Sequence, residues 1–431
     1  MSKSYDKRAN AIIVTLLFPF IGLVVSLRHW REKWAKNTFW LACVYFGAIF
    51  IYCPSGTLLG DGGDGGRYVL KLIDMYNNAS TSLAGIFSAF RDQGNQVTMD
   101  LYQPLMTFLI SRFTDSGHML FAAFAIVFGF FYSRNIWFIL ERLPKKNFGV
   151  LFILVALFFL VCPITSINGV RMWTALHVFV YGMMPFVLEH NKSKLWWSFI
   201  SPLFHFSYLY VVLIAVLFIV IPRRFTSRFS LLLYVLYFLF IISLFINSIN
   251  YDSVSQILVE YSPESYEARI GGFVSQDYAD ARSEASALNN WYVGASGLII
   301  HWTYCLVLVF LLPYMKHYFA NNPSFIRLYY FTLLLSGFAN VSSLIPSGGR
   351  FQLLSQMFVL PLILLVAMNM SKRTGFRKMV SCFSIVLILP LIFQLRQLLD
   401  YFSITLFFGN FFTLLFWENN VPLISYLKRI V

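Results

Sequence analysis

The stretch FQLLSQMFVLPLILLVAMNM, residues 351–370, contains no charged side chain. A helix that crosses a bilayer core needs about 20 mostly apolar residues, so this stretch is long enough to span. Comparable runs with almost no charge recur at residues 150–161, 231–245, 298–312, 325–338 and 379–393. Backbone polar groups in lipid must be paired inside a helix or a closed barrel, and these runs are continuous rather than alternating. The sequence therefore predicts an all-α, polytopic integral membrane helical bundle.

Composition and charge agree with a membrane protein. Of the 431 residues, 58% are hydrophobic and 12% are charged, whereas a soluble domain carries about 25% charged residues. The net charge is +14, and the lysines and arginines lie in short clusters between apolar runs, at residues 28–36, 141–146, 192–194, 223–228, 316–327 and 372–378. The positive-inside rule predicts this pattern for cytoplasmic loops. We therefore expect these basic clusters to lie at the surface of the lipid bilayer, and we do not expect the protein to bind nucleic acid.

The alternation of basic clusters and apolar runs predicts one transmembrane domain, residues 1–431, with about 11 to 13 hydrophobic segments. Two long loops fall on the outer face, residues 54–117 and the acidic residues 249–290. The apolar run 195–221 has basic residues at both ends and is interrupted by Pro202, which favours a broken or re-entrant pair of helices. The five cysteines lack metal-ligand spacing, so we expect neither a metal nor a cofactor.

With this topology, the unusual polar residues gather on the outer face. Arg171 and Arg350 each follow a short glycine-containing turn at the expected start of a helix. A helix N-terminus offers unpaired N–H groups and positive dipole character, and a guanidinium binds phosphate through two hydrogen bonds, so each position suits an anion. The alternative is that each arginine extends to the membrane interface for structural reasons alone.

Two further features have more than one interpretation. The glycine-rich run 61–67 contains Asp61 and Asp64 and has three interpretations. It is a flexible turn, a site whose backbone or carboxylates bind a hydroxyl-bearing substrate, or a cation site. His205 follows the break at Pro202. It is either a hydrogen-bonded buried histidine or a group for acid–base chemistry, because an unperturbed imidazole titrates near neutral pH.

Several short motifs, taken in order, resemble the EpsG family. The matching pieces run from about residue 38 to about residue 370 and are the acidic-to-aromatic element Asp64 to Tyr68, Gln103-Pro104-Leu105, Asn168-x-x-Arg171 followed by Ala175, His205-x-Ser207, and Gly349-Arg350. The resemblance implies a Wzy-type polymerase of O-antigen or capsule repeat units, related to GT-C-type glycosyltransferases. It places the protein in the bacterial inner membrane with its site facing the periplasm. The implied substrate is an undecaprenyl-diphosphate-linked oligosaccharide, and the implied partners are flippase and chain-length regulator proteins.

The resemblance also suggests a role for each polar residue. The expected diphosphate-binding residues are Arg171, Arg350 and Arg67, which stabilise the leaving group. The expected catalytic residues are His205, Asp64 and Asp61. The expected glycan-binding residues are Tyr68, Gln103, Asn168 and Ser207.

Three alternatives remain open from the sequence. A lipid-linked polysaccharide flippase or transporter would use the same polar residues as a translocation path. An O-antigen-ligase-like glycosyltransferase would share the chemistry of a polymerase. The acidic loop 249–290 either gates the site and binds glycan or is a solvated loop.

Overall fold

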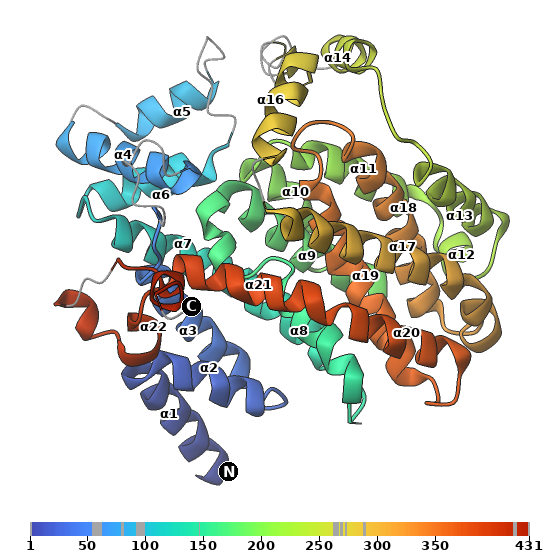
Figure 1. Cartoon of the computed structure of the whole chain (residues 1–431), viewed down its shortest axis with the longest axis horizontal. Coiled ribbons are helices and arrows are strands. Elements are labelled where there is room, and N and C mark those ends of the chain that lie inside the picture. Colours follow the sequence, from blue (N-terminus) through green and yellow to red (C-terminus); the bar gives the residue numbers. More distant parts are fainter. Residues whose placement is uncertain are drawn as a thin grey trace.

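The chain is described here from a computed structural model. The described residues are 2–53, 63–78, 82–91, 100–145, 147–261, 267, 270–271, 274–287, 290–416 and 420–429. Within these ranges the regular elements are all helices, as the sequence predicts (Figure 1). Asp61, one of the predicted catalytic residues, lies outside the described residues.

The N-terminal half consists of short helices around two long ones. Its elements are α1 (Ser2–Leu17), α2 (Pro19–Arg28), α3 (Ala35–Ala48), α4 (Gly63–Asn77), α5 (Leu83–Arg91), α6 (Tyr102–Ser111), α7 (Gly117–Leu140), η2 (Gly149–Leu151), α8 (Phe152–Leu160), η3 (Ile164–Gly169) and α9 (Val170–Glu189). Helices α4, α5 and α6 belong to the predicted outer loop 54–117 and form a group at one end of the molecule (Figure 1).

The C-terminal half carries the second predicted outer loop and the remaining long helices. Its elements are α10 (Leu195–Ile200), η4 (Ser201–Leu203), α11 (Tyr208–Val220), α12 (Arg223–Thr226), α13 (Leu231–Ser243), α14 (Tyr251–Glu260), α16 (Gln276–Ala287), α17 (Trp291–Tyr318), α18 (Pro323–Ser342), α19 (Arg350–Asn369), α20 (Gly375–Val386), α21 (Ile388–Tyr401), α22 (Thr405–Phe408), η6 (Thr413–Leu415) and α23 (Leu423–Leu427). Helices α14 and α16 lie along the upper edge in Figure 1.

Membrane-spanning length and hydropathy are found in four helical stretches of the described chain, namely Gly117–Leu140, Gly149–Glu189, Trp291–Tyr318 and Arg350–Asn369. Helices α20 and α21 together make a fifth candidate, bent by 43°. Shorter apolar helices, among them α2, α11 and α13, supply others of the predicted hydrophobic segments. The protein is therefore a polytopic helical membrane protein.

The predicted interruption of the run 195–221 is confirmed. Helix α10 ends at Ile200, Pro202 lies in the single turn η4, and α11 begins only at Tyr208. Proline lacks a backbone N–H and so cannot continue the helical ladder. Residues 204–207 therefore form a non-helical turn between two short helices, and this turn carries His205 and Ser207.

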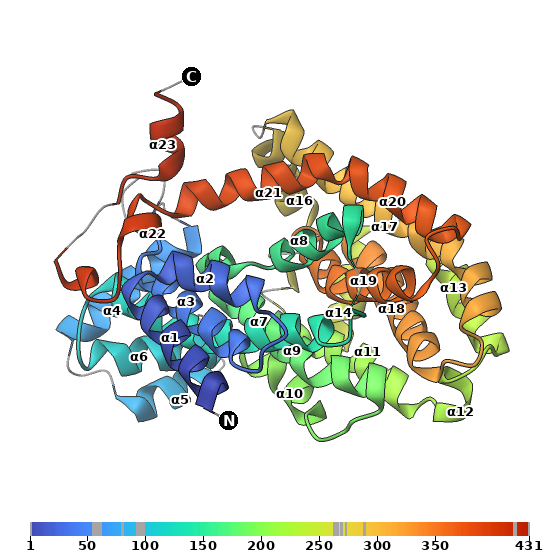
Figure 2. The same ribbon diagram turned by 90° about the horizontal axis from the view of Figure 1, so that it is seen from below.

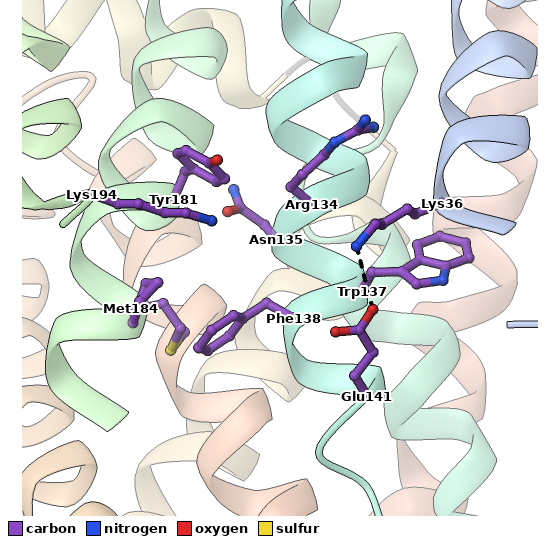
Figure 3. Close-up of a pocket in the computed structure, with 10 residues that line it drawn as sticks. Lys36, Arg134, Asn135, Trp137, Phe138, Glu141, Tyr181, Met184 and Lys194 are labelled. Atoms are coloured by element: carbon purple, nitrogen blue, oxygen red, sulfur yellow. Dashed lines mark ion pairs between the residues drawn. The ribbon is translucent and has the colours of Figure 1, made fainter. Parts of the chain in front are cut away.

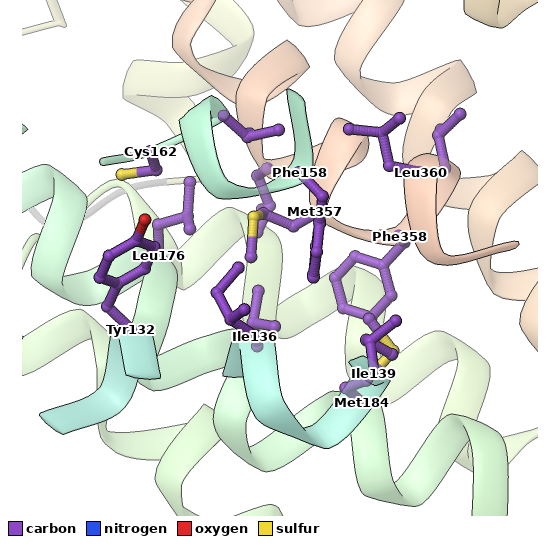
Figure 4. Packing of buried hydrophobic residues seen from close by; sticks show 14 of the residues in the cluster. Tyr132, Ile136, Ile139, Phe158, Cys162, Leu176, Met184, Met357, Phe358 and Leu360 are labelled. Atoms are coloured by element: carbon purple, nitrogen blue, oxygen red, sulfur yellow. The ribbon is translucent and has the colours of Figure 1, made fainter. Parts of the chain in front are cut away.

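The core is a close-packed apolar layer centred on α7 and α9, which Figures 1 and 2 both place near the middle of the bundle. Side chains from α7, α8, α9 and α19 meet there, including Ile136, Phe158, Leu176 and Phe358 (Figure 4). Each of these four is at most 1% exposed. In lipid, helix association depends on close packing and interhelical hydrogen bonds more than on exclusion of water. This layer fixes α9, which carries one of the predicted arginines.

Helices α3 and α7 approach each other especially closely at Gly47. A Cβ atom at residue 47 would lie 2.2 Å from Ala125 Cβ and 2.7 Å from the Phe121 carbonyl oxygen. The second of these atoms is backbone and cannot rotate away. Glycine is thus required at this contact, as is common where membrane helices pack backbone to backbone.

We predict that Gly47→Ala lowers the free energy of unfolding by about 1–3 kcal/mol, because overpacking forces the two helices apart. The matched control is Gly297→Ala in α17, where no atom lies within 4 Å of the added Cβ. Alanine is the better helix former, so the control should be neutral or slightly stabilised. Thermal unfolding of the purified protein in detergent measures both. A melting temperature of Gly47→Ala equal to that of the control would contradict the prediction.

Candidate active site

A cavity of about 660 Å³ lies where α4, α9, the 204–207 turn, α16 and the α18–α19 connection meet. Six of the residues predicted from the sequence line it, namely Asp64, Arg67, Arg171, His205, Ser207 and Arg350. They come from segments that are far apart in the chain. The fold therefore brings most of the predicted site together in one place.

Arg171 and Arg350 occupy helix starts, as predicted. Arg171 is the second residue of α9 and follows the 3₁₀ segment η3, and Arg350 is the first residue of α19. The turn before α19 is tightly folded, because Ser347 has φ 68° and a Cβ at Gly348 would lie 1.8 Å from the Ser342 carbonyl oxygen. Only glycine fits there, so this turn fixes where Arg350 enters the cavity.

Asp100 is a site residue that the sequence analysis missed. Its side chain is 1% exposed, and its carboxylate accepts a hydrogen bond from Arg171 Nη1 at 3.1 Å and another from the Phe206 backbone N–H at 2.8 Å. A buried carboxylate is stable only when it is paired and hydrogen-bonded in this way. Asp100 thus joins the start of α9 to the broken segment that carries His205. A carboxylate directly before the apolar stretch of α6 was the signal that could have identified it.

Tyr68 stands behind Arg171 and is not among the residues that line the cavity. Its hydroxyl accepts a hydrogen bond from Arg171 Nε at 3.2 Å. Burial raises the pKa of Tyr68 to about 12, against the opposing effect of the Arg171 guanidinium. The phenol is therefore neutral at physiological pH and acts as a second hydrogen-bond partner of the arginine. The predicted contact of Tyr68 with glycan stays a prediction.

Two other predicted residues also lie away from the cavity wall. Gln103 is buried in α6 and donates a hydrogen bond to Thr107 Oγ1 at 2.8 Å. Asn168 lies in η3 and packs closely against α4, since a Cβ at Gly65 would come within 2.3 Å of Asn168 Oδ1. Gln103 is thus satisfied within its own helix, and Asn168 lies at the contact between η3 and α4.

His205 forms hydrogen bonds to Ser207 through its Nδ1. Its Nδ1 accepts a hydrogen bond from the Ser207 backbone N–H at 3.3 Å and lies 2.8 Å from Ser207 Oγ. A ring nitrogen that accepts from an amide N–H carries no proton, so the neutral imidazole has its proton on Nε2. In this arrangement Nε2 is a hydrogen-bond donor.

The predicted acidic loop 249–290 contributes to the cavity through α16. Tyr278 and Arg282 line the wall, and the Tyr278 hydroxyl lies 3.3 Å from Ser347 Oγ in the turn before Arg350. The loop is recognisable in the sequence by its acidic residues, but Tyr278 and Arg282 are not, because nothing in the sequence distinguishes one face of a polar helix from the other.

The cavity is strongly cationic. The described lining residues include four arginines (Arg67, Arg171, Arg282 and Arg350) and a single carboxylate, Asp64. Asp64 forms an ion pair with Arg67 on the same helix. In the described part of the chain no group of three or more His, Cys, Asp or Glu side chains is arranged to hold a metal ion. The arrangement can therefore bind a ligand with more than one negative charge through guanidinium groups.

The fold and this cavity define a polytopic helical membrane protein with a cationic site between helix ends. The chain belongs to the EpsG family, which matches residues 62–408. This family is associated with Wzy-type polysaccharide polymerases, and membership indicates a function of the polysaccharide-polymerase type. No curated protein and no solved structure matches the chain. The expected likeness to GT-C-type glycosyltransferases therefore stays a prediction.

We predict that Asp100 and Arg171 are energetically coupled. In a double-mutant cycle with Asp100→Asn and Arg171→Gln, the coupling in the free energy of unfolding should be about 1–3 kcal/mol, because each single change leaves a largely buried partner unsatisfied. The control is the half-buried i,i+4 helix pair Arg396–Asp400, with N–O distance 3.0 Å, whose carboxylate is 28% exposed against 1% for Asp100. Its coupling should be only about 0.3–0.5 kcal/mol. Equal coupling in the two cycles would show that the Asp100 pair does not organise the site.

Proposed function

We propose that this protein polymerises undecaprenyl-diphosphate-linked oligosaccharide repeat units into a surface polysaccharide. The reaction takes place at the outer leaflet of the bacterial inner membrane, in the cavity described above. The observation that carries this proposal is the convergence of Arg171, Arg350 and His205 on one cationic cavity in a chain of the EpsG family. The proposed partners are a flippase that supplies the lipid-linked units and a protein that regulates chain length.

The reaction transfers the growing chain from one lipid to another. A hydroxyl oxygen of the incoming lipid-linked unit forms a bond to the anomeric carbon of the growing chain. The bond between that carbon and the lipid diphosphate breaks, and the diphosphate leaves with the bonding electrons. The hydroxyl proton passes to a base. Negative charge therefore builds up on the diphosphate in the transition state, and this charge is what the protein must stabilise.

Fixed guanidinium groups suit this task. Stabilisation of developing charge is most effective when the donors are already oriented and need not reorganise during the reaction. Asp100 and Tyr68 hold Arg171, and the glycine-dependent turn at 346–349 positions Arg350. Arginine also binds phosphate through two parallel hydrogen bonds that lysine cannot reproduce. We assign the leaving diphosphate to Arg171 and Arg350, with Arg67 and Arg282 at the same cavity.

We assign different roles to His205 and Asp64. Nδ1 of His205 accepts from the Ser207 backbone N–H, so a neutral imidazole carries its proton on Nε2, and the role we assign to this N–H is to orient a substrate oxygen. Asp64 is the only carboxylate among the described residues that line the cavity. We therefore assign acceptance of the hydroxyl proton to Asp64 and positioning of the substrate to His205.

Deletion of the gene followed by sizing of the surface glycan tests the function. Loss of long chains with single repeat units retained on the surface is the result we expect. Loss of all surface attachment would indicate a ligase, and lipid-linked units confined to the inner leaflet would indicate a flippase.

In complemented cells, Arg171→Lys and Arg350→Ala should each reduce polymer at least about 100-fold, the size typical for loss of one transition-state donor. The exposed Arg224→Lys is the control, and normal polymer from both site variants would exclude the assigned arginines.

The roles of His205 and Asp64 are separated by conservative substitutions. Gln at residue 205 retains an N–H donor, so His205→Gln should keep more polymer than His205→Ala. Asp64→Asn removes the proton acceptor and should reduce polymer about 10²–10⁴-fold. Protein levels are matched by immunoblotting, and the exposed His317→Ala serves as the histidine control. If His205→Gln is as inactive as His205→Ala while Asp64→Asn stays active, the histidine is the base.

A further inference from the structure

A second, smaller cavity of about 110 Å³ lies between α3, α7, α9 and the start of α10. Three cationic side chains and one carboxylate line it, namely Lys36, Arg134, Lys194 and Glu141. In Figure 3, Lys194 reaches into the space from one side and Lys36 from the other. The cavity therefore carries an excess of positive charge, and nothing in the proposed polymerase reaction uses it.

The positive charge is only partly neutralised. Lys36 pairs with Glu141 at 3.6 Å. Arg134 instead donates to two neutral oxygens, Ser133 Oγ at 2.8 Å and Asn37 Oδ1 at 2.6 Å. Lys194 Nζ lies 4.3 Å from the centre of the Tyr181 ring. Among the described residues, no ion pair involves Arg134 or Lys194. Two cations that border this cavity, Arg134 and Lys194, thus have no carboxylate partner among the described residues.

This cavity is separate from the candidate active site. Tyr181, Met184 and Pro185 line it from the later turns of α9, whereas Arg171 lies in the first turn of that helix. At 1.5 Å per residue the two sites are roughly 15–21 Å apart along the helix. The cavity is also bordered by the basic clusters 28–36, 141–146 and 192–194, which the positive-inside rule assigns to the cytoplasmic side.

The surroundings favour a lipid over a soluble anion. Tyr181 lines the cavity, and tyrosine and tryptophan side chains are typical of the level of lipid headgroups. Directly after Lys194, helix α10 exposes Trp196 by 51% and Phe199 by 43%. A lipid whose phosphate lies between Arg134 and Lys194 could place its acyl chains against these apolar side chains. A free phosphate would leave them without a partner.

We propose that this cavity binds the headgroup of an anionic phospholipid of the cytoplasmic leaflet. Arg134 and Lys194 contact the phosphate, and Tyr181 and the exposed face of α10 contact the rest of the lipid. Basic pockets between membrane helices are suited to such headgroups. This inference does not depend on the proposed reaction, since it concerns the opposite end of α9.

Native mass spectrometry of the purified full chain with added phosphatidylglycerol tests the proposal. The double variant Arg134→Gln/Lys194→Gln should retain roughly 10- to 30-fold less bound phosphatidylglycerol than the wild type, because two charges near the headgroup are removed. Lys194→Gln alone leaves the contacts of Arg134 with its neighbours intact and should show roughly a five-fold loss. The control Arg224→Gln/Arg228→Gln removes two exposed arginines of another basic cluster and should retain lipid like the wild type.

Two results would contradict the proposal of a lipid-binding site. Equal loss of lipid from the control and the double variant would mean that general surface charge, not this cavity, attracts lipid. Thermal stabilisation by inorganic phosphate that equals stabilisation by phosphatidylglycerol would identify a small-anion site instead. Zwitterionic phosphatidylcholine provides the reference, and its retention should be the same in all variants.

Discussion

The buried carboxylate of Asp100 links two parts of the candidate site that the chain itself keeps apart. It accepts hydrogen bonds from Arg171 on α9 and from the backbone of Phe206 in the broken segment. The backbone reinforces this connection, since Leu101 N–H donates to the Leu203 carbonyl oxygen at 2.9 Å. The orientation of the arginine and the position of the histidine turn are therefore set by one group. Without it, Arg171 would have a neutral phenol and the solvent as partners, and the turn would lose the acceptor of one backbone N–H.

The sequence predicts those features of the structure that depend on a few neighbouring residues. The interruption at Pro202 and the helix starts at Arg171 and Arg350 follow from proline chemistry and from glycine-containing turns, and the structure contains all three. These signals act over a few residues, so no knowledge of the tertiary fold is needed to read them. The same holds for the helical membrane character, which continuous apolar runs determine through the need to pair backbone groups in lipid.

Contacts between residues far apart in the chain could not be predicted from the sequence. Asp100 and Phe206 are 106 residues apart, and Tyr68 and Arg171 are 103 residues apart. Nothing local indicates that Tyr68 supports an arginine instead of facing a substrate. Gln103 shows a related difficulty, because helix α6 is apolar around most of its circumference and gives no indication of which face is inward. Its amide is in fact satisfied by Thr107 one turn later on the same helix.

Helix α9 borders both cationic cavities and is held by hydrogen bonds along its length. In its middle, His177 Nε2 donates to the Cys162 carbonyl oxygen at 3.0 Å, and Asn135 on α7 donates to the His177 carbonyl oxygen at 2.8 Å. At its C-terminal end, the buried Arg327 of α18 donates to the Phe186 and Val187 carbonyl oxygens, each at 3.2 Å, in the last turn, where helix carbonyls lack i+4 partners or share them. Contacts thus hold the helix at its start, middle and end. The guanidinium of Arg171, the one arginine on α9, is oriented by Asp100 and Tyr68 before a ligand binds, which is the condition under which charge stabilisation is strongest.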